Sequence, residues 1–96
     1  MSEIVVISIN VAKPGKENEL ADLLSSLIAP TAADAGMIRY DLHRDLADPR
    51  TFAFYEIWES RKALDDHLST EHIARYRRLA PPLLERKELR IMEKTN

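Results

Sequence analysis

The sequence predicts one α+β domain, whose secondary structure elements follow the order strand, helix, strand, strand, helix, strand. Its 96 residues (1–96) are the length of a single domain, and no repeat or change of composition divides them. Apolar residues recur with period two in some segments, as in strands, and at i, i+3, i+4 in others, as in amphipathic helices. The two glycines, Gly15 and Gly36, fall between these segments, where the chain has to turn.

The first two elements are a buried strand and a long helix. Residues 3–11 are rich in β-branched side chains, and both alternating sets of positions carry apolar residues, which predicts a strand buried on two sides. Pro14-Gly15 then predicts a turn. One helix is expected to begin near Glu17 and to end before Pro30 or somewhat past it, with Gly36 as the stop. The reason is the helical spacing of Leu20, Leu23, Leu24, Leu27 and Ile28.

A β-hairpin follows. Residues 37–44 alternate, with Ile38, Tyr40 and Leu42 on one face, and residues 52–59 alternate again. The polar connection between them contains Asp48-Pro49, which favours a turn. On the second strand one face carries the side chains of Phe52, Phe54, Glu56 and Trp58.

The last third of the chain predicts two short helices and a final strand. Ser60 is a good N-cap for the first helix, and Ser69-Thr70 interrupts the helical pattern and can begin the second. Pro81-Pro82 ends the helical region, and a strand is expected over residues 88–93. This order is the ferredoxin-like βαββαβ arrangement, a four-stranded antiparallel sheet with helices on one face.

The first and third strands carry apolar side chains on both faces. An antiparallel sheet with one face in water normally alternates apolar and polar residues. A second copy of the chain, packed sheet against sheet, would cover the other face, so we expect a homodimer with two-fold symmetry.

Composition and charge exclude several classes of partner. Fourteen basic and sixteen acidic residues give a formal net charge of −2, which does not indicate a nucleic-acid partner. The apolar start of the chain is far shorter than the roughly 20 residues that span a bilayer, and it lacks a basic region, so neither a membrane partner nor a signal peptide is expected. The absence of cysteine favours a cytoplasmic location.

Five residues are candidates for chemistry, and each also has a purely structural interpretation. Glu56 lies between aromatic residues on its strand, where shielding from water would raise the pKa of its carboxyl, although an arginine or a backbone donor at the strand end could simply fix it. Trp58 and Tyr40 could contact a ligand or pack in the core. His67 and His72 could meet near the mouth of a cavity, where proton transfer is possible, or one of them could be solvated. They do not have the spacing of a zinc-binding helix, so no metal is expected.

The chain resembles the antibiotic biosynthesis monooxygenase family, including its quinol monooxygenase-like members. The likeness covers nearly the whole chain, and its most specific segments are Glu-x-Trp at residues 56–58 and His-x-x-Thr-x-His at residues 67–72, with residues 13–15, 35–42 and 48–49 in support. The resemblance implies a dimeric α+β barrel that holds a small aromatic or polyketide-like substrate between the sheet and the helices.

The resemblance also implies an activity and roles for the five candidates. Several members of the family oxidise a hydroxylated aromatic compound or quinol with O₂ and need neither metal nor flavin, because a deprotonated phenol can itself give an electron to oxygen. By resemblance, the catalytic residues are His72, His67 and Glu56, and the substrate-binding residues are Trp58 and Tyr40. Two alternatives stay open: an isomerase or other small-metabolite enzyme on the same scaffold, and a dimer that binds a metabolite without converting it.

Overall fold

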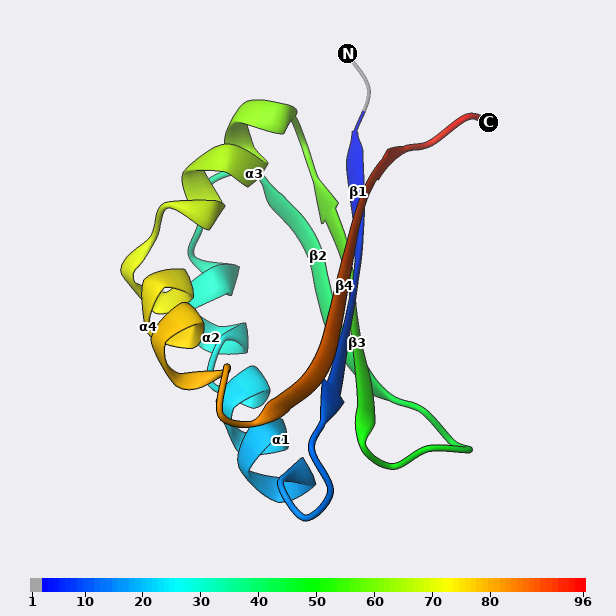
Figure 1. Ribbon diagram of the computed structural model, residues 1–96. Coiled ribbons are helices and arrows are strands. Elements are labelled where there is room, and N and C mark those ends of the chain that lie inside the picture. The colour runs from blue at the N-terminus through cyan, green and yellow to red at the C-terminus, as the bar shows by residue number, and fades with distance from the viewer. Residues whose placement is uncertain (1–2) are drawn as a thin grey trace.

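A computed structural model describes residues 3–96 as one sheet with all the helices on one side (Figure 1). The antiparallel strands lie in the order β2-β3-β1-β4. This is the predicted ferredoxin-like fold. The elements are β1 (Ile4–Ala12), α1 (Glu17–Ser25), α2 (Ile28–Ala32), β2 (Met37–Arg44), β3 (Thr51–Trp58), α3 (Arg61–Leu68), α4 (Glu71–Leu79) and β4 (Leu84–Glu93). Among residues 3–96, no helix is both long and apolar enough to cross a membrane.

The single long helix predicted after Glu17 is wrong, because the chain forms two helices with a break at Ser26 and Leu27. The hydroxyl of Ser26 donates to the carbonyl of Leu23 at 2.6 Å, at the end of α1. Pro30 cannot donate a backbone hydrogen bond inside a continuing helix, but it is tolerated in the first turn of a new one. Beginning α2 at Ile28 places Pro30 in that first turn.

The inner face of the sheet, which the helices cover, holds the core. In β3 it carries Phe52, Phe54, Glu56 and Trp58, all of them buried, as the alternation predicted. In β1 the inner positions after Val6 are Ser8 and Asn10, so the inner face becomes polar toward that end of the strand. The more apolar set of β1 side chains therefore points outward.

The start of β2 differs from the prediction that Ile38 shares a face with Tyr40. Met37 pairs with Trp58 and Arg39 pairs with Ile57, so the pairing skips Ile38, whose side chain is 50% exposed. Met37 packs against the buried cluster around Trp58 in its place. An extra residue in one strand of a pair is a β-bulge, and it turns the following side chains to the opposite face.

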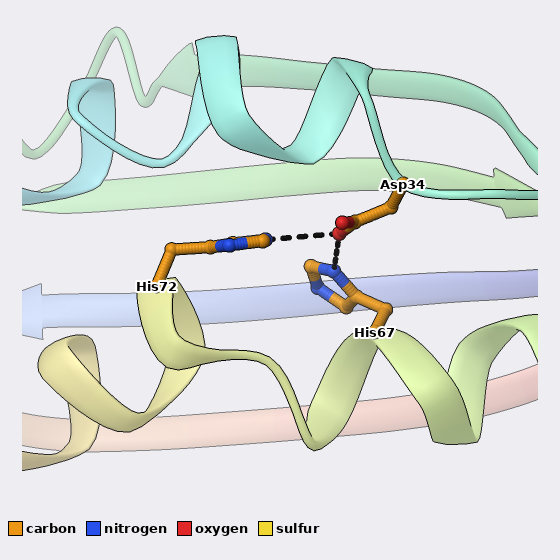
Figure 2. A group of neighbouring side chains, drawn as sticks. All are labelled: Asp34, His67 and His72. Carbon is orange, nitrogen blue, oxygen red and sulfur yellow. Dashed lines mark hydrogen bonds and ion pairs between the residues drawn. The ribbon is translucent and has the colours of Figure 1, made fainter.

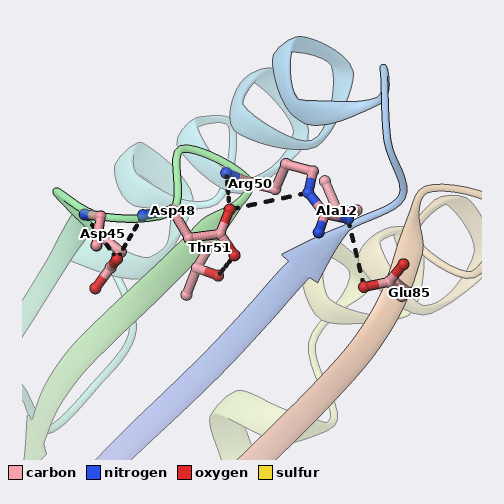
Figure 3. Close-up of polar contacts among 7 residues, drawn as sticks. Ala12, Asp45, Asp48, Arg50, Thr51 and Glu85 are labelled. Carbon is pink, nitrogen blue, oxygen red and sulfur yellow. Dashed lines mark hydrogen bonds and ion pairs between the residues drawn. The ribbon is translucent and has the colours of Figure 1, made fainter.

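Polar side chains fix the end of the sheet at which the β2–β3 hairpin lies (Figure 3). Asp45 Oδ2 accepts hydrogen bonds from the backbone N–H groups of Ala47 and Asp48 at 3.0 and 2.7 Å. Arg50 donates to the carbonyl of Ala12 at 3.0 Å and to the carboxylate of Glu85 at 3.3 Å. These contacts join the predicted turn to both β1 and β4.

The helical half begins and ends near the predicted positions. The hydroxyl of Ser60 caps α3 by accepting from the N–H of Ala63 at 3.1 Å, as expected. Thr70 is the N-cap residue of α4, but its hydroxyl donates to the carbonyl of His67 at 2.7 Å. β4 begins at Leu84, four residues earlier than expected, which places Lys87 within the strand and opposite Asn10.

Candidate functional site

A cavity of about 150 Å³ lies between the inner face of the sheet and the helices. Its walls are mainly apolar, and side chains of all four strands and of α1, α3 and α4 contribute to them. Six ionisable side chains are among the lining residues: Tyr40, Glu56, His67, Tyr76, Arg77 and Lys87. The apolar lining includes Leu24, Leu27, Phe54, Leu64, Ile73 and Leu89.

Three of the five candidates from the sequence line this cavity: Tyr40, Glu56 and His67. Trp58 is fully buried behind them and contacts both Glu56 and His67. His72 is also outside the lining, and it reaches the site through a hydrogen bond to another residue. The sheet and two helices thus bring all five candidates into one region.

Glu56 is a buried carboxyl in an apolar cavity, held by its neighbour on the same strand face. The indole N–H of Trp58 donates to Oε1 of Glu56 at 2.9 Å. Burial raises the pKa of Glu56 to about 7, although the hydrogen bond from Trp58 and the charge of Lys87 partly oppose the shift. A carboxyl that titrates near neutrality can exchange protons with a ligand at physiological pH.

His67 and His72 converge on one carboxylate oxygen (Figure 2). Oδ2 of Asp34 lies 2.7 Å from Nδ1 of His67 and 2.9 Å from Nε2 of His72. Asp34 follows α2, whereas the histidines belong to α3 and α4. Burial lowers the pKa of His67, and Asp34 partly offsets this effect. His67 can therefore act as a neutral base near pH 7.

Asp34, His67 and His72 are also the described residues that could hold a metal ion, since their ligand atoms all lie within 4.8 Å of one another. Two imidazole nitrogens and a carboxylate oxygen suit transition metals. In this structure, however, both nitrogens point at the same oxygen and satisfy it by hydrogen bonding. An ion could bind only if both of these hydrogen bonds were broken.

Tyr40 forms part of the aromatic wall beside His67. Its ring stacks on Phe54 with centroids 4.4 Å apart, and it meets the ring of His67 edge to face at 5.8 Å. Burial, together with the nearby carboxylate of Glu56, raises the pKa of the Tyr40 phenol. The phenol therefore stays protonated and can donate a hydrogen bond to a ligand.

A second polar group lies farther along the sheet and was not predicted. The hydroxyl of Tyr76 donates to Oδ1 of Asn10, whose Nδ2 donates to the hydroxyl of Ser8 at 3.2 Å. The ammonium of Lys87 lies 4.4 Å above the ring of Tyr76. Burial and the charge of Arg77 lower the pKa of Lys87, and Glu56 partly offsets this.

Comparison with known proteins relates most of the chain to one family. The family model described as antibiotic biosynthesis monooxygenase matches residues 3–79. The protein named "Putative monooxygenase Rv0793" of Mycobacterium tuberculosis is 35% identical over 85 residues, which are 88% of this chain and 83% of that protein. An uncharacterised Synechocystis protein, sll1783, is 32% identical over 81 residues, 83% of this chain, which spans only 55% of that relative's length.

Solved structures agree with this match. The crystal structure of PA3566 from Pseudomonas aeruginosa superposes with a TM-score of 0.95 at 32% identity, covering 100% of this chain and 97% of that one. The structure of Rv0793 from Mycobacterium tuberculosis superposes with a TM-score of 0.94 at 29% identity, covering 99% of this chain and 97% of that one.

Proposed function

Because the chain belongs to the antibiotic biosynthesis monooxygenase family, we propose that it oxidises a small hydroxylated aromatic compound, such as a quinol, with O₂. The observation that carries the proposal is the presence of two proton acceptors, Glu56 and His67, in one apolar cavity. Ionising a phenol is the step that prepares it to give an electron to oxygen. An apolar lining excludes water from the ionised ring and from the intermediates that follow.

The size of the cavity favours a ligand with one ring. Its volume is about 150 Å³, and an engineered protein cavity of about this size binds benzene. The stacked rings of Tyr40 and Phe54 provide a flat wall for such a ligand. A fused polyketide would need the cavity to widen, so a monocyclic phenol or quinol is the preferred substrate class.

The proposed reaction needs only the phenol and O₂. A ring carbon para or ortho to the hydroxyl loses its C–H bond and becomes a second carbonyl carbon, with one oxygen atom of O₂. The other oxygen atom leaves as water, with the phenolic hydrogen and the ring hydrogen. The phenol is thereby oxidised to a quinone. The residues proposed to act are Glu56 and His67 on protons, with Tyr40 as a hydrogen-bond donor.

Oxygen-dependent turnover tests this proposal. With a panel of monocyclic phenols and hydroquinones, and with EDTA-treated protein in the absence of flavin, we expect O₂ uptake matched by quinone formation. His67→Ala should lower turnover about 10²- to 10⁴-fold, the usual contribution of a proton-transfer group. His43→Ala is the control, because His43 is an exposed histidine on β2. Substrate binding without oxygen uptake would instead support a binding protein and reject the proposed monooxygenase.

A second candidate, an isomerase or similar enzyme acting on an anionic metabolite, is favoured by one observation. Arg77 and Lys87 line the cavity, and the side-chain ammonium of Lys87 forms no ion pair or hydrogen bond with another of the described residues 3–96. Two cations at one end could hold a phosphate or carboxylate group. Conversion of phosphorylated substrates under strictly anaerobic conditions would favour this candidate over the monooxygenase.

We also propose that the protein functions as a homodimer joined through the outer face of the sheet. The two central strands present half-buried apolar side chains there: Val5, Ile7, Ile9, Ala53, Tyr55 and Ile57. The edge strands present ion pairs instead, Arg39 with Asp41 and Arg90 with Glu88. An apolar centre with a charged rim is the usual arrangement of a protein interface.

Light scattering after size exclusion tests the dimer. The wild type should have a mass near 22 kDa, twice the 11.0 kDa of one chain. Ile7→Arg should shift the protein to the monomer, because it places a charge at the centre of the apolar face. The control is Arg90→Glu, which changes charge only at the rim, where Arg90 is the cross-strand partner of Ile7. A wild-type mass of 11 kDa at micromolar concentration would rule the dimer out.

A further inference from the structure

Asp34 is the residue on which both histidines of the site depend. The same atom, Oδ2, faces Nδ1 of His67 and Nε2 of His72 (Figure 2). An ionised carboxylate can only accept hydrogen bonds, so both of these nitrogens must carry a proton. In a neutral imidazole the other nitrogen then has no proton. Asp34 therefore selects the tautomer of each ring and leaves Nε2 of His67 as a hydrogen-bond acceptor.

Packing against aromatic side chains fixes the orientation of the His67 ring. It stacks at a tilt on Trp58 with centroids 4.4 Å apart, and it touches the edge of Tyr40. Its side chain is only 2% exposed, and it lines the cavity. Among residues 3–96, no hydrogen-bond partner occupies its Nε2. The cavity is thus where this nitrogen can find one.

His72 differs from His67 in two respects. It does not line the cavity, and its side chain is 19% exposed. Through its hydrogen bond, His72 connects Asp34 Oδ2 to α4, while His67 connects the same oxygen to α3. The carboxylate is therefore held between these two helices. This geometry distinguishes the roles of the two histidines that the sequence could not separate.

We propose that Asp34 is a positioning residue that makes Nε2 of His67 the acceptor of the ligand's hydroxyl proton. This inference deepens the proposed oxidation and rests on it. The ligand O–H bond breaks, its proton moves to Nε2, and the bonding electron pair stays on the phenolate oxygen. The resulting imidazolium keeps its Nδ1–H on Asp34, whose negative charge stabilises it. The proton later returns to the oxygen atom that leaves as water.

Nitrogen NMR of the unliganded protein tests the first half of the inference without any variant. At a pH where His67 is neutral, its ¹⁵N signals should be those of the Nδ1–H tautomer. The titratable and charged groups that face the His67 ring are Asp34, Tyr40 on β2, and His72 and Arg77 on α4. The Nε2–H tautomer would overturn the inference even if the protein oxidised phenols.

Asp34→Asn tests the second half. The asparagine amide can donate to Nδ1, which favours the wrong tautomer, and it cannot stabilise the imidazolium. We expect kcat to fall about 10²- to 10⁴-fold, with little change in the affinity for an unreactive phenol analogue. The pKa of His67 should fall further, because the carboxylate that raises it is gone. Asp34→Glu should recover part of the activity.

The matched control is Asp66→Asn, on the same helix as His67. Asp66 is an exposed carboxylate that pairs with Lys62 at 2.8 Å, so its loss should change neither kcat nor the tautomer.

An Asp34→Asn protein with wild-type kcat and an unchanged pKa of His67 would overturn the inference. If the wild type oxidises no phenol at all, the proposed reaction fails, while the NMR measurement still decides the role of Asp34. If Asp34→Asn does not fold, Asp34→Glu and the wild-type spectrum decide.

Discussion

Gly36→Ala is expected to destabilise the protein by about 2–5 kcal/mol. Gly36 has φ +80, a left-handed conformation that costs a residue with a Cβ about 1–2 kcal/mol. An added Cβ would also lie 2.5 Å from Cβ of Ala63 and 2.9 Å from Cγ of Glu59. Because Ala63 is held in α3 and cannot rotate away, this overlap adds about 1–3 kcal/mol.

Gly15→Ala is a control that separates the two causes. Gly15 has nearly the same backbone conformation, with φ +81, but nothing lies within 4 Å of an added Cβ. The Gly15→Ala variant should therefore lose only the backbone contribution to the free energy of unfolding, about 1–2 kcal/mol. Urea unfolding of both variants at one protein concentration, followed by the fluorescence of Trp58, measures the difference. Equal losses would show that the contact with Ala63 is not tight.

The backbone at Gly36 also helps to position a residue of the candidate site, Asp34. The carbonyl of Gly36 accepts from the N–H of Glu59 at 2.9 Å, which joins the start of β2 to the end of β3. Asp34 is two residues earlier, so this close approach sets the position of the carboxylate opposite α3 and α4. A Gly36→Ala protein that still folds should lose part of the hydrogen bonding between Asp34 and the histidines.

The fold could be predicted because its elements carry strong periodicities. The alternation of residues 52–58 and the helical spacing of leucines after Glu17 each indicate one type of element. The break at Ser26 and the bulge at Ile38 could not be predicted in the same way. Both depend on how the chain packs against neighbouring elements. Each alters which face of the element is presented by only a few residues, so neither changes the overall periodicity.

The candidate site could be predicted from the sequence only in part. Glu56, His67 and Tyr40 lie on elements whose inner face the pattern identified, so their convergence could be expected. Asp34 lies in a short connection without periodicity, and it is 33 residues from His67 in the sequence. Lys87 was missed because the start of β4 is charged and does not alternate. A polar residue in a loop has no sequence signal until the fold brings its partners to it.

Glu56→Gln is expected to stabilise the protein at pH 8 and to leave its stability nearly unchanged near pH 4. In the folded state the pKa of Glu56 is raised to about 7 from an unfolded value of 4.5. Between these values the folded state binds more protons than the unfolded state, so the contribution of Glu56 to the free energy of unfolding falls as pH rises. Above pH 7 the full cost of ionising this buried carboxyl is about 3 kcal/mol. Glutamine has no charge and avoids that cost.

The comparison needs a control that removes a glutamate without removing a buried charge. Glu59→Gln serves, because Glu59 is exposed just beyond the end of β3. Thermal unfolding of the wild type and both variants from pH 4 to pH 8 gives the pH dependence of each difference. A difference for Glu56→Gln that does not change with pH would mean that the carboxyl titrates normally.

The same variant relates stability to function. Glutamine can still accept the hydrogen bond from the indole of Trp58, which the wild type makes at 2.9 Å, so the cavity should keep its shape. If the proton of the ligand goes to His67, Glu56→Gln should reduce kcat much less than His67→Ala does. A larger loss would identify Glu56 as the main proton acceptor. A carboxyl that lowers stability at neutral pH is typical of a residue retained for function, because stability and activity often place opposing demands on an active site.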